Sequence, residues 1–182
     1  MPERIRTDRL LLRPLSEADA ERLAIVLNDP AVLRQVLTWP SPITALHVAG
    51  RIAMANARAA ASGDILQFGV DLPGEGLIGM IGGSVNAEGV GRFGYMLGSA
   101  YWGRGLGREA VAGWMAAARA RGAARFEAEV FLDNPRSARV LEALGFADAG
   151  PGAAGFCLGR LEMAQARLYR RDVAPAAASQ AA

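Results

Sequence analysis

The stretch Tyr101-Trp102-Gly103-Arg104-Gly105-Leu106-Gly107-Arg108-Glu109-Ala110 decides how this chain is interpreted. Three glycines alternate with larger residues, and glycine lets a backbone turn tightly and approach a ligand closely. A helical pattern begins inside the stretch, so free N–H groups and the positive end of the helix dipole point at whatever lies before it. Arg104 and Arg108 add positive charge. The pattern predicts a phosphate or pyrophosphate site, although a plain glycine-rich loop and a dinucleotide fingerprint have the same local pattern.

The segments before this loop indicate an antiparallel meander. Strand-like runs cover Ile65–Leu72, Leu77–Val85 and Val90–Leu97. Their connectors, residues 73–76 and 86–89, have the composition of hairpin loops. A dinucleotide-binding fold places its glycine loop after the first strand of a parallel sheet, with an acid about 20 residues further on. The late position of this loop therefore disfavours that fold.

The rest of the chain predicts helices before the meander and a mixture of helices and strands after the loop. Before the meander we expect a strand at 9–14, a helix that begins at Ser16, a short helix through Leu37, and a long helix that starts at Ser41-Pro42 and ends at Gly63. After the meander we expect a helix at 105–121, a strand at 126–132 and a helix at 133–144. A hairpin formed by residues 155–161 and 165–170 is expected to follow. Residues 172–182 lack a periodic pattern and are predicted to be a disordered tail.

Composition narrows the classes of function. The 182 residues, 52% of them apolar, suit one packed domain, and a net charge of +2 does not indicate a nucleic-acid binder. All 20 basic residues are Arg, which excludes Schiff-base and P-loop lysine chemistry. With one cysteine, Cys157, and one histidine, His47, an internal disulfide and a zinc cluster are excluded. Neither a secretory signal nor a long apolar run is visible, so we expect a cytoplasmic protein with no metal, membrane or nucleic-acid partner.

Four segments, taken in order, form a recognisable set. They are Thr7-Asp8-Arg9-Leu10-Leu11-Leu12-Arg13, Gly94-Tyr95-Met96-Leu97, the stretch from Tyr101 to Ala110, and Asn134-Pro135-Arg136-Ser137 followed by Leu144-Gly145-Phe146. Together they resemble motifs of the GNAT acetyltransferase superfamily, and within it those of the Rim-type group that acts on ribosomal-protein N-termini. The resemblance covers residues 5–171. The superfamily commonly has Gln or Arg where Trp102 stands, but the pyrophosphate is held mainly by backbone.

The resemblance implies an α+β fold with a mixed, mostly antiparallel twisted sheet of about seven strands, flanked by helices and splayed between strands four and five. Residues 1–171 would form one domain. Acetyl-CoA would lie in the notch where the two strands part, and no metal is implied. The residues implied to hold it are Met96, Leu97 and Gly98 beside the pantetheine arm, Trp102, Gly103, Arg104, Gly105, Leu106, Gly107 and Arg108 around the pyrophosphate, and Asn134 beside the pantetheine amides.

The residues that would move protons match the resemblance less completely. Many relatives carry a tyrosine acid after the asparagine motif, but residues 138–144 contain none, and Rim-type relatives suggest the serine of that motif, here Ser137. Their glutamate on strand four is replaced by Arg92, which cannot act as a base. Glu127 and Glu129 share one face of the predicted strand, so Glu129 could instead act through a water molecule; a solvated strand face is the alternative interpretation. His47, or loss of the proton to bulk water without a base, stays open as an alternative.

The function implied is direct transfer of an acetyl group from acetyl-CoA to a primary amine, either a protein N-terminus or a small amine. Trp39 and Tyr95 are predicted to line the acceptor pocket. A catalytically silent acyl-CoA-binding module stays open, because the tyrosine is missing and Arg92 replaces the glutamate. A nucleotide-binding domain is a third interpretation. The protein is expected to be a monomer or a homodimer.

Overall fold

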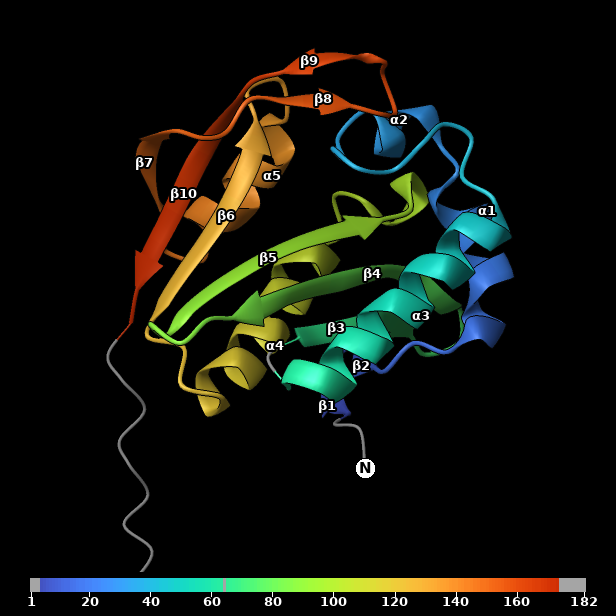
Figure 1. Ribbon diagram of the computed structural model, residues 1–182, viewed down its shortest axis with the longest axis horizontal. Coiled ribbons are helices and arrows are strands. Elements are labelled where there is room, and N and C mark those ends of the chain that lie inside the picture. Colours follow the sequence, from blue (N-terminus) through green and yellow to red (C-terminus); the bar gives the residue numbers. More distant parts are fainter. Residues whose placement is uncertain (1–3, 64, 174–182) are drawn as a thin grey trace, which may run out of the picture.

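The computed structural model describes residues 4–63 and 65–173, and its centre is one eight-stranded sheet (Figure 1). The strand order is β1-β2-β3-β4-β5-β6-β10-β7, and every neighbouring pair is antiparallel except β5 and β6. The predicted mixed, mostly antiparallel sheet is therefore confirmed. The strands are β1 (Ile5–Arg6), β2 (Leu11–Arg13), β3 (Ile65–Leu72), β4 (Gly76–Val85), β5 (Val90–Leu97), β6 (Arg125–Phe131), β7 (Ala147–Pro151) and β10 (Ala166–Asp172), with β8 (Gly155–Cys157) and β9 (Glu162–Ala164) in a separate two-stranded ribbon.

Helices cover both faces of the sheet (Figure 1). The α3 face carries the 3-10 turn η1 (Glu17–Asp19), α1 (Ala20–Leu27), α2 (Pro30–Leu33) and α3 (Ala45–Ser62). The α4 face carries α4 (Leu106–Ala120) and α5 (Pro135–Glu142), with the 3-10 turn η2 (Ser99–Tyr101) just before α4. Successive strand residues point to opposite faces, so every strand contributes to both layers.

The core of the α4 face has aromatic residues at its centre. The Trp114 side chain is fully buried, and its ring centroid lies 4.9 Å from that of Phe93 and 6.3 Å from that of Phe126. Its indole N–H donates to the Leu66 carbonyl over 3.0 Å, so the polar atom of this large side chain is satisfied. This packing fixes α4 against the sheet and thereby positions the loop at its N-terminus.

β5 and β6 separate soon after they begin. Their parallel pairing covers Val90↔Arg125, Gly91↔Phe126 and Arg92↔Glu127 and goes no further, although β5 continues to Leu97 and β6 to Phe131. This is the predicted splay between strands four and five. The two strands are labelled β5 and β6 because β1, the first strand of the chain, was not predicted. The unpaired edges leave main-chain N–H and C=O groups available to a ligand.

The predicted helices of the α3 face have different boundaries in the structure. α3 begins at Ala45 rather than at the Ser41-Pro42 pair, because Thr44 is its cap: the Thr44 hydroxyl accepts from the His47 N–H at 3.3 Å. The short helix expected through Leu37 ends at Leu33. The exit at Gly63 is confirmed, with a left-handed φ of 71°.

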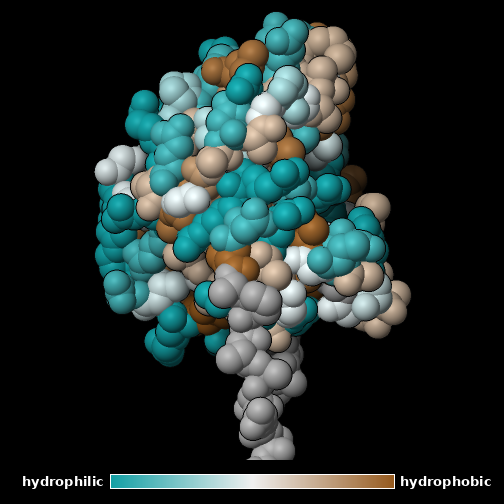
Figure 2. All heavy atoms as spheres, turned by 90° about the vertical axis from the view of Figure 1, so that its left-hand side faces the viewer, coloured by the Kyte–Doolittle hydropathy of each residue, from teal (hydrophilic) through white to brown (hydrophobic). Residues whose placement is uncertain are grey.

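The predicted final hairpin is wrong. β8 pairs with β9, whereas β10 lies between β6 and an unpredicted strand, β7. The run from Gly155 turns back at residues 158–161, and β7 lacks the β-branched residues that signal a strand. Asp172 still pairs with Arg125, so the predicted tail does not begin there; residues 174–182 lie outside the described residues. The face that contains β7 and β10 is mostly hydrophilic (Figure 2).

Candidate functional site

A cavity of about 1230 Å³ opens where β5 and β6 part. Two predicted site residues do not line it. The Gly98 N–H is already bonded to the Ile78 carbonyl at 3.0 Å, and the Arg104 guanidinium reaches Glu75 at 3.2 Å. The predicted residues that do line it are Met96, Leu97, Trp102, Gly103, Gly105, Leu106, Gly107, Arg108, Asn134, Ser137, Glu129, Trp39 and Tyr95.

The glycine loop fits an anion through its backbone. Gly103 and Gly105 have φ angles of 75° and 77°, which larger residues adopt with strain. Gly105 is the N-cap of α4, and no side chain caps this helix, so its first-turn N–H groups are free to bind a ligand. Gly107 lies against Tyr95: a Cβ built there would be 3.3 Å from the Tyr95 ring. These features fit the pyrophosphate that the sequence predicts, with Arg108 beside it on the cavity wall.

Ionic contacts brace the outer side of the loop. Arg9 donates through Nη1 to the Arg104 carbonyl at 2.9 Å and through Nε to Glu109 at 2.7 Å. Glu109 also accepts from the Thr7 hydroxyl at 2.5 Å. Burial raises the pKa of Glu109, but the bonds from Thr7 and Arg9 outweigh it and lower the pKa overall. The loop conformation is therefore tied to the first strands of the sheet.

Trp102 has two contacts that explain its place in the loop. Its indole N–H donates to the Leu97 carbonyl at 2.9 Å, and the Arg136 guanidinium lies 4.2 Å from the ring centroid. The first contact ties the loop to the end of β5, and the second ties it to the start of α5 by a cation–π interaction. The Leu97 carbonyl therefore already has one partner.

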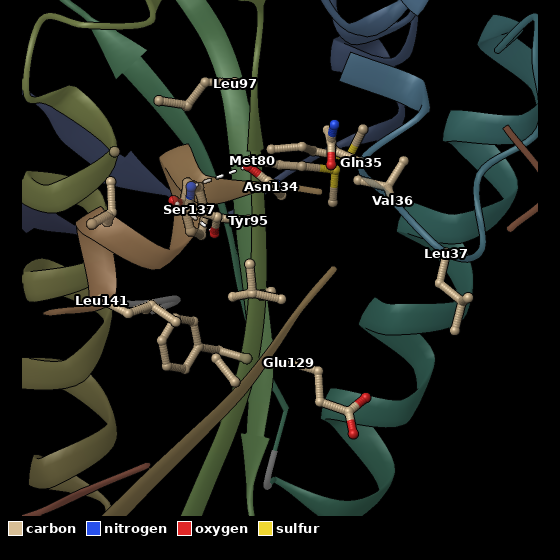
Figure 3. A pocket seen from close by; sticks show the side chains of 18 of the residues that line it. Gln35, Val36, Leu37, Met80, Tyr95, Leu97, Glu129, Asn134, Ser137 and Leu141 are labelled. Atoms are coloured by element: carbon tan, nitrogen blue, oxygen red, sulfur yellow. Dashed lines mark hydrogen bonds between the residues drawn. The ribbon is translucent and has the colours of Figure 1, made fainter. Parts of the chain in front are cut away.

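Two hydroxyl groups meet on the α4 face of the cavity. The Tyr95 hydroxyl lies 3.2 Å from Ser137 Oγ, and Figure 3 shows both side chains together beside the start of α5. Asn134 caps that helix, because its Oδ1 accepts from the Ser137 N–H at 3.1 Å. Burial raises the pKa of Tyr95. Tyr95 was predicted as an acceptor contact. Its contact with Ser137, the predicted acid, is signalled by no motif and places a second hydroxyl group beside that serine.

Charged side chains line the α3 face of the cavity. Glu127 is buried and binds Arg92 at 2.9 Å and Arg170 at 3.1 Å. Burial raises the pKa of Glu127, but the two arginines outweigh it, so the net shift is downward. Glu129 is exposed, its Oε1 accepts from the Ala153 N–H at 2.9 Å, and its side chain extends toward α3 (Figure 3). Of the two glutamates, Glu127 is bound by two arginines, whereas no ion pair joins Glu129 to the other described residues.

The other predicted residues lie in different surroundings. Trp39 is buried, and the Arg51 guanidinium lies 4.4 Å from its ring centroid. His47 is exposed in the capping box of α3 and does not line the cavity, so its position does not support a role as the general base. Within residues 4–63 and 65–173, no group of three or more His, Cys, Asp and Glu side chains could hold a metal ion. None of the helices in the described part of the chain is long and apolar enough to cross a membrane.

A family profile of the acetyltransferase (GNAT) domain matches residues 9–147. The chain therefore belongs to the GNAT acetyltransferase family. No curated protein sequence matches it.

Solved structures share its fold at low sequence identity. MccE, a microcin self-immunity acetyltransferase solved with acetyl-CoA and AMP, has a TM-score of 0.78 at 16% identity, over 92% of this chain and 94% of that one. RimL, a ribosomal α-N-protein acetyltransferase solved with coenzyme A, has a TM-score of 0.76 at 20% identity, over 94% and 98%. A ribosomal-protein alanine acetyltransferase from Vibrio fischeri has a TM-score of 0.75 at 23% identity, over 93% and 96%.

Proposed function

We propose that this acetyltransferase moves the acetyl group of acetyl-CoA directly to a primary amine. The observation that carries the proposal is that one cavity joins the uncapped N-terminus of α4, the Tyr95–Ser137 hydroxyl pair and the Glu129 carboxylate. They provide an anion cradle, a proton donor and a proton acceptor, which are the three functions that transfer from a thioester to an ammonium group requires.

The donor is held mostly by main-chain groups. The first-turn N–H groups of α4 bind the pyrophosphate, with Arg108 beside them. The open edge of β5 at Met96 and Leu97 runs along the pantetheine arm, and Asn134, whose Oδ1 already caps α5, offers its Nδ2 donor. Acetyl-CoA supplies a thioester whose carbonyl carbon bonds to the amine nitrogen while the sulfur leaves.

Ser137 and Tyr95 handle the proton on the leaving side. Ser137 Oγ donates to the departing sulfur while it accepts from the Tyr95 hydroxyl. Because burial raises the pKa of Tyr95, this phenol stays protonated at neutral pH and remains a donor. General-acid help of this kind is typically worth about a hundred- to ten-thousand-fold in rate.

Glu129 handles the proton on the attacking side. An α-amine has a pKa of about 8, so at neutral pH most of it is an ammonium that must lose a proton before it attacks. Glu129 lies on the α3 face of the gap and takes that proton through a water molecule.

Turnover against a panel of amines tests the proposal. Thiol release from acetyl-CoA is followed with each amine, and acetyl-CoA binding is measured separately by calorimetry. Thiol release that depends on a primary amine supports transfer. Tight binding of acetyl-CoA without turnover of any amine contradicts it and favours a silent acyl-CoA-binding module. Stabilisation by ATP but not by acetyl-CoA contradicts both the transferase and the silent module. A thermal-shift assay detects it, because a ligand at 100 times its Kd raises the free energy of unfolding by about 2.7 kcal/mol.

The proposal extends to the form in which the protein works. Residues 1–171 act as one domain in the cytoplasm, as a monomer or homodimer. Support for the single domain comes from the sheet, which takes strands from β1 to β10. A single buried thiol, Cys157, suits a reducing compartment. Sedimentation and fractionation measure the assembly state and the location.

A further inference from the structure

The α3 face of the cavity is a trough with a glycine floor. The strand register places Gln67, Gly82 and Gly94 in one row across β3, β4 and β5. A Cβ built at Gly94 meets no atom within 4 Å, so the cavity is open above this residue. Glu129 stands one strand further on, across the gap, two residues beyond the last β5–β6 pair. The trough therefore runs from the sheet into the gap where the donor is proposed to lie.

Positive charge borders this trough on the sheet. The adjacent row contains Arg92, Glu127 and Arg170 on β5, β6 and β10. One carboxylate lies between two guanidinium groups, so the row keeps one excess positive charge. The Arg92 side chain is 72% exposed and lines the cavity, while Glu127 beneath it is only 8% exposed. The side of the row that a ligand meets is therefore cationic.

Arg58, in the last turns of α3, adds another cation to the lining of the same cavity. It is exposed, and no hydrogen bond or ion pair joins its guanidinium to the other residues that the structure describes. Arg51, on the same helix, differs because it binds Thr38 and stacks on Trp39. Arg58 is thus a guanidinium that lines the cavity with its donors free.

We infer that this trough selects acceptors in which the primary amine is joined to a carboxylate or phosphate group. The amine lies beside Glu129, next to the gap, and the anion lies beside Arg58 and Arg92. The lining of the trough combines the Glu129 carboxylate with these guanidinium groups, and an acceptor that carries both charges pairs with both kinds of group. This substrate class rests on the proposed amine acetylation.

Matched acceptors that differ only in charge test the inference. Phosphoethanolamine is compared with ethanolamine, and a peptide beginning Ser-Asp-Glu with one beginning Ser-Asn-Gln. The wild type should prefer the anionic member of at least one pair by about tenfold in kcat/KM, because the neutral member lacks the charge-assisted hydrogen bonds to the guanidinium groups. Which pair responds distinguishes a small amine from an acidic N-terminus. Equal rates, or preference for the neutral members, would overturn the inference.

Arg58→Gln should raise KM for the preferred anionic acceptor about tenfold and leave the neutral partner unchanged. Arg58→Glu should reverse the preference. Arg125→Gln is the matched control, because Arg125 is exposed on β6, does not line the cavity and pairs with Asp172. If Arg58→Gln slowed both members of a pair equally, or if Arg125→Gln matched its effect, the anion site would be wrong.

Binding without turnover separates this inference from the proposed function. The coenzyme A-loaded enzyme is titrated with phosphoethanolamine and ethanolamine by calorimetry, where no acetyl group can move. Tighter binding of phosphoethanolamine that is lost in Arg58→Gln supports the trough even if no amine is ever acetylated. A Cβ at Gly94 meets no atom within 4 Å, so Gly94→Val should fill the floor, weaken acceptor binding about tenfold or more and leave the Kd of acetyl-CoA unchanged. Unaltered acceptor binding in this variant would overturn the trough.

Discussion

The two faces of the sheet meet in one cavity, but they line it with different chemistry. On the α4 face, the wall combines a glycine loop, a helix N-terminus and the open edge of a strand with three arginines of α4 and α5, Arg108, Arg136 and Arg139. On the α3 face, the wall is made of side chains such as Arg58, Arg92 and Glu129. Backbone recognition depends on φ and ψ, whereas side-chain recognition depends on charge. Substitutions should therefore affect donor and acceptor separately.

The largest effect expected is on chemistry at the α4 face. Ser137→Ala should lower kcat at least about a hundredfold with little change in the Kd of acetyl-CoA, because a general acid acts only after binding. Tyr95→Phe should cost less, about five- to tenfold, and the double variant should be no slower than Ser137→Ala, because the hydroxyls act in series. Single-turnover rates measure both. Independent, multiplying losses would show that the two hydroxyls do not form a relay.

A slightly smaller effect tests the backbone cradle. Gly105→Asp puts a carboxylate at the N-terminus of α4, close to the proposed pyrophosphate site. At an effective dielectric of 20, two like charges about 5 Å apart repel by about 3 kcal/mol. After screening by salt, the affinity for acetyl-CoA should therefore fall by about 30- to 100-fold. Gly105→Asn is the matched control, because asparagine tolerates the same left-handed φ without the charge. Calorimetry measures both. Equal losses would assign the effect to conformation instead of charge.

The contrast between the faces explains what could be predicted from the sequence. The glycine loop is local: three glycines within five residues carry the signal, and family motifs on either side support it. The trough is assembled from Arg58, Gly94 and Glu129, which are 35 or more residues apart, and its orientation depends on strand register. A shift of one residue in that register would turn Glu129 to the opposite face.

Strand pairing could likewise not be predicted from the sequence pattern. β3 and β5 were predicted with their observed bounds, because alternation and turn residues define them. β7 was missed, since its small residues give no periodic signal and it is a strand only because β10 pairs with it. The contact between Tyr95 and Ser137 joins residues that are 42 positions apart, so only the structure of the splayed sheet reveals it.

The α3 face offers a smaller, pH-dependent test. Glu129→Gln should lower kcat/KM about tenfold at pH 7, where an acceptor amine with a pKa of about 8 is mostly protonated. The difference from wild type should vanish near pH 9, because the free amine then needs no base. Glu88→Gln, in the exposed 86–89 turn, is the control. A deficit that persists unchanged to pH 9 would mean that Glu129 acts through folding or the shape of the site instead of through the charge of the amine.

The smallest effect concerns how the α3-face layer is attached to the sheet. Arg13 on β2 binds Asp19 of η1 at 2.8 Å and Asp71 on β3 at 2.5 Å, whereas α4 is held by the aromatic core around Trp114. The hydrogen bond from Arg13 outweighs burial and lowers the pKa of Asp19. A carboxyl whose pKa is lower folded than unfolded adds stability above the unfolded value of about 3.9, and this stability is lost as the pH falls through the folded pKa.

Asp19→Asn should therefore lower the free energy of unfolding by about 1–2 kcal/mol at pH 7, and the difference from wild type should shrink once the pH drops below about 4. Urea unfolding at several pH values measures it. Asp8→Asn is the control, since Asp8 is exposed and no bond or ion pair joins its side chain to the other described residues. A difference in the free energy of unfolding that stayed constant down to pH 3 would mean that Asp19 contributes through the shape and polarity of its side chain. Charge would then contribute no more to holding the α3-face layer than it does to holding the α4 face.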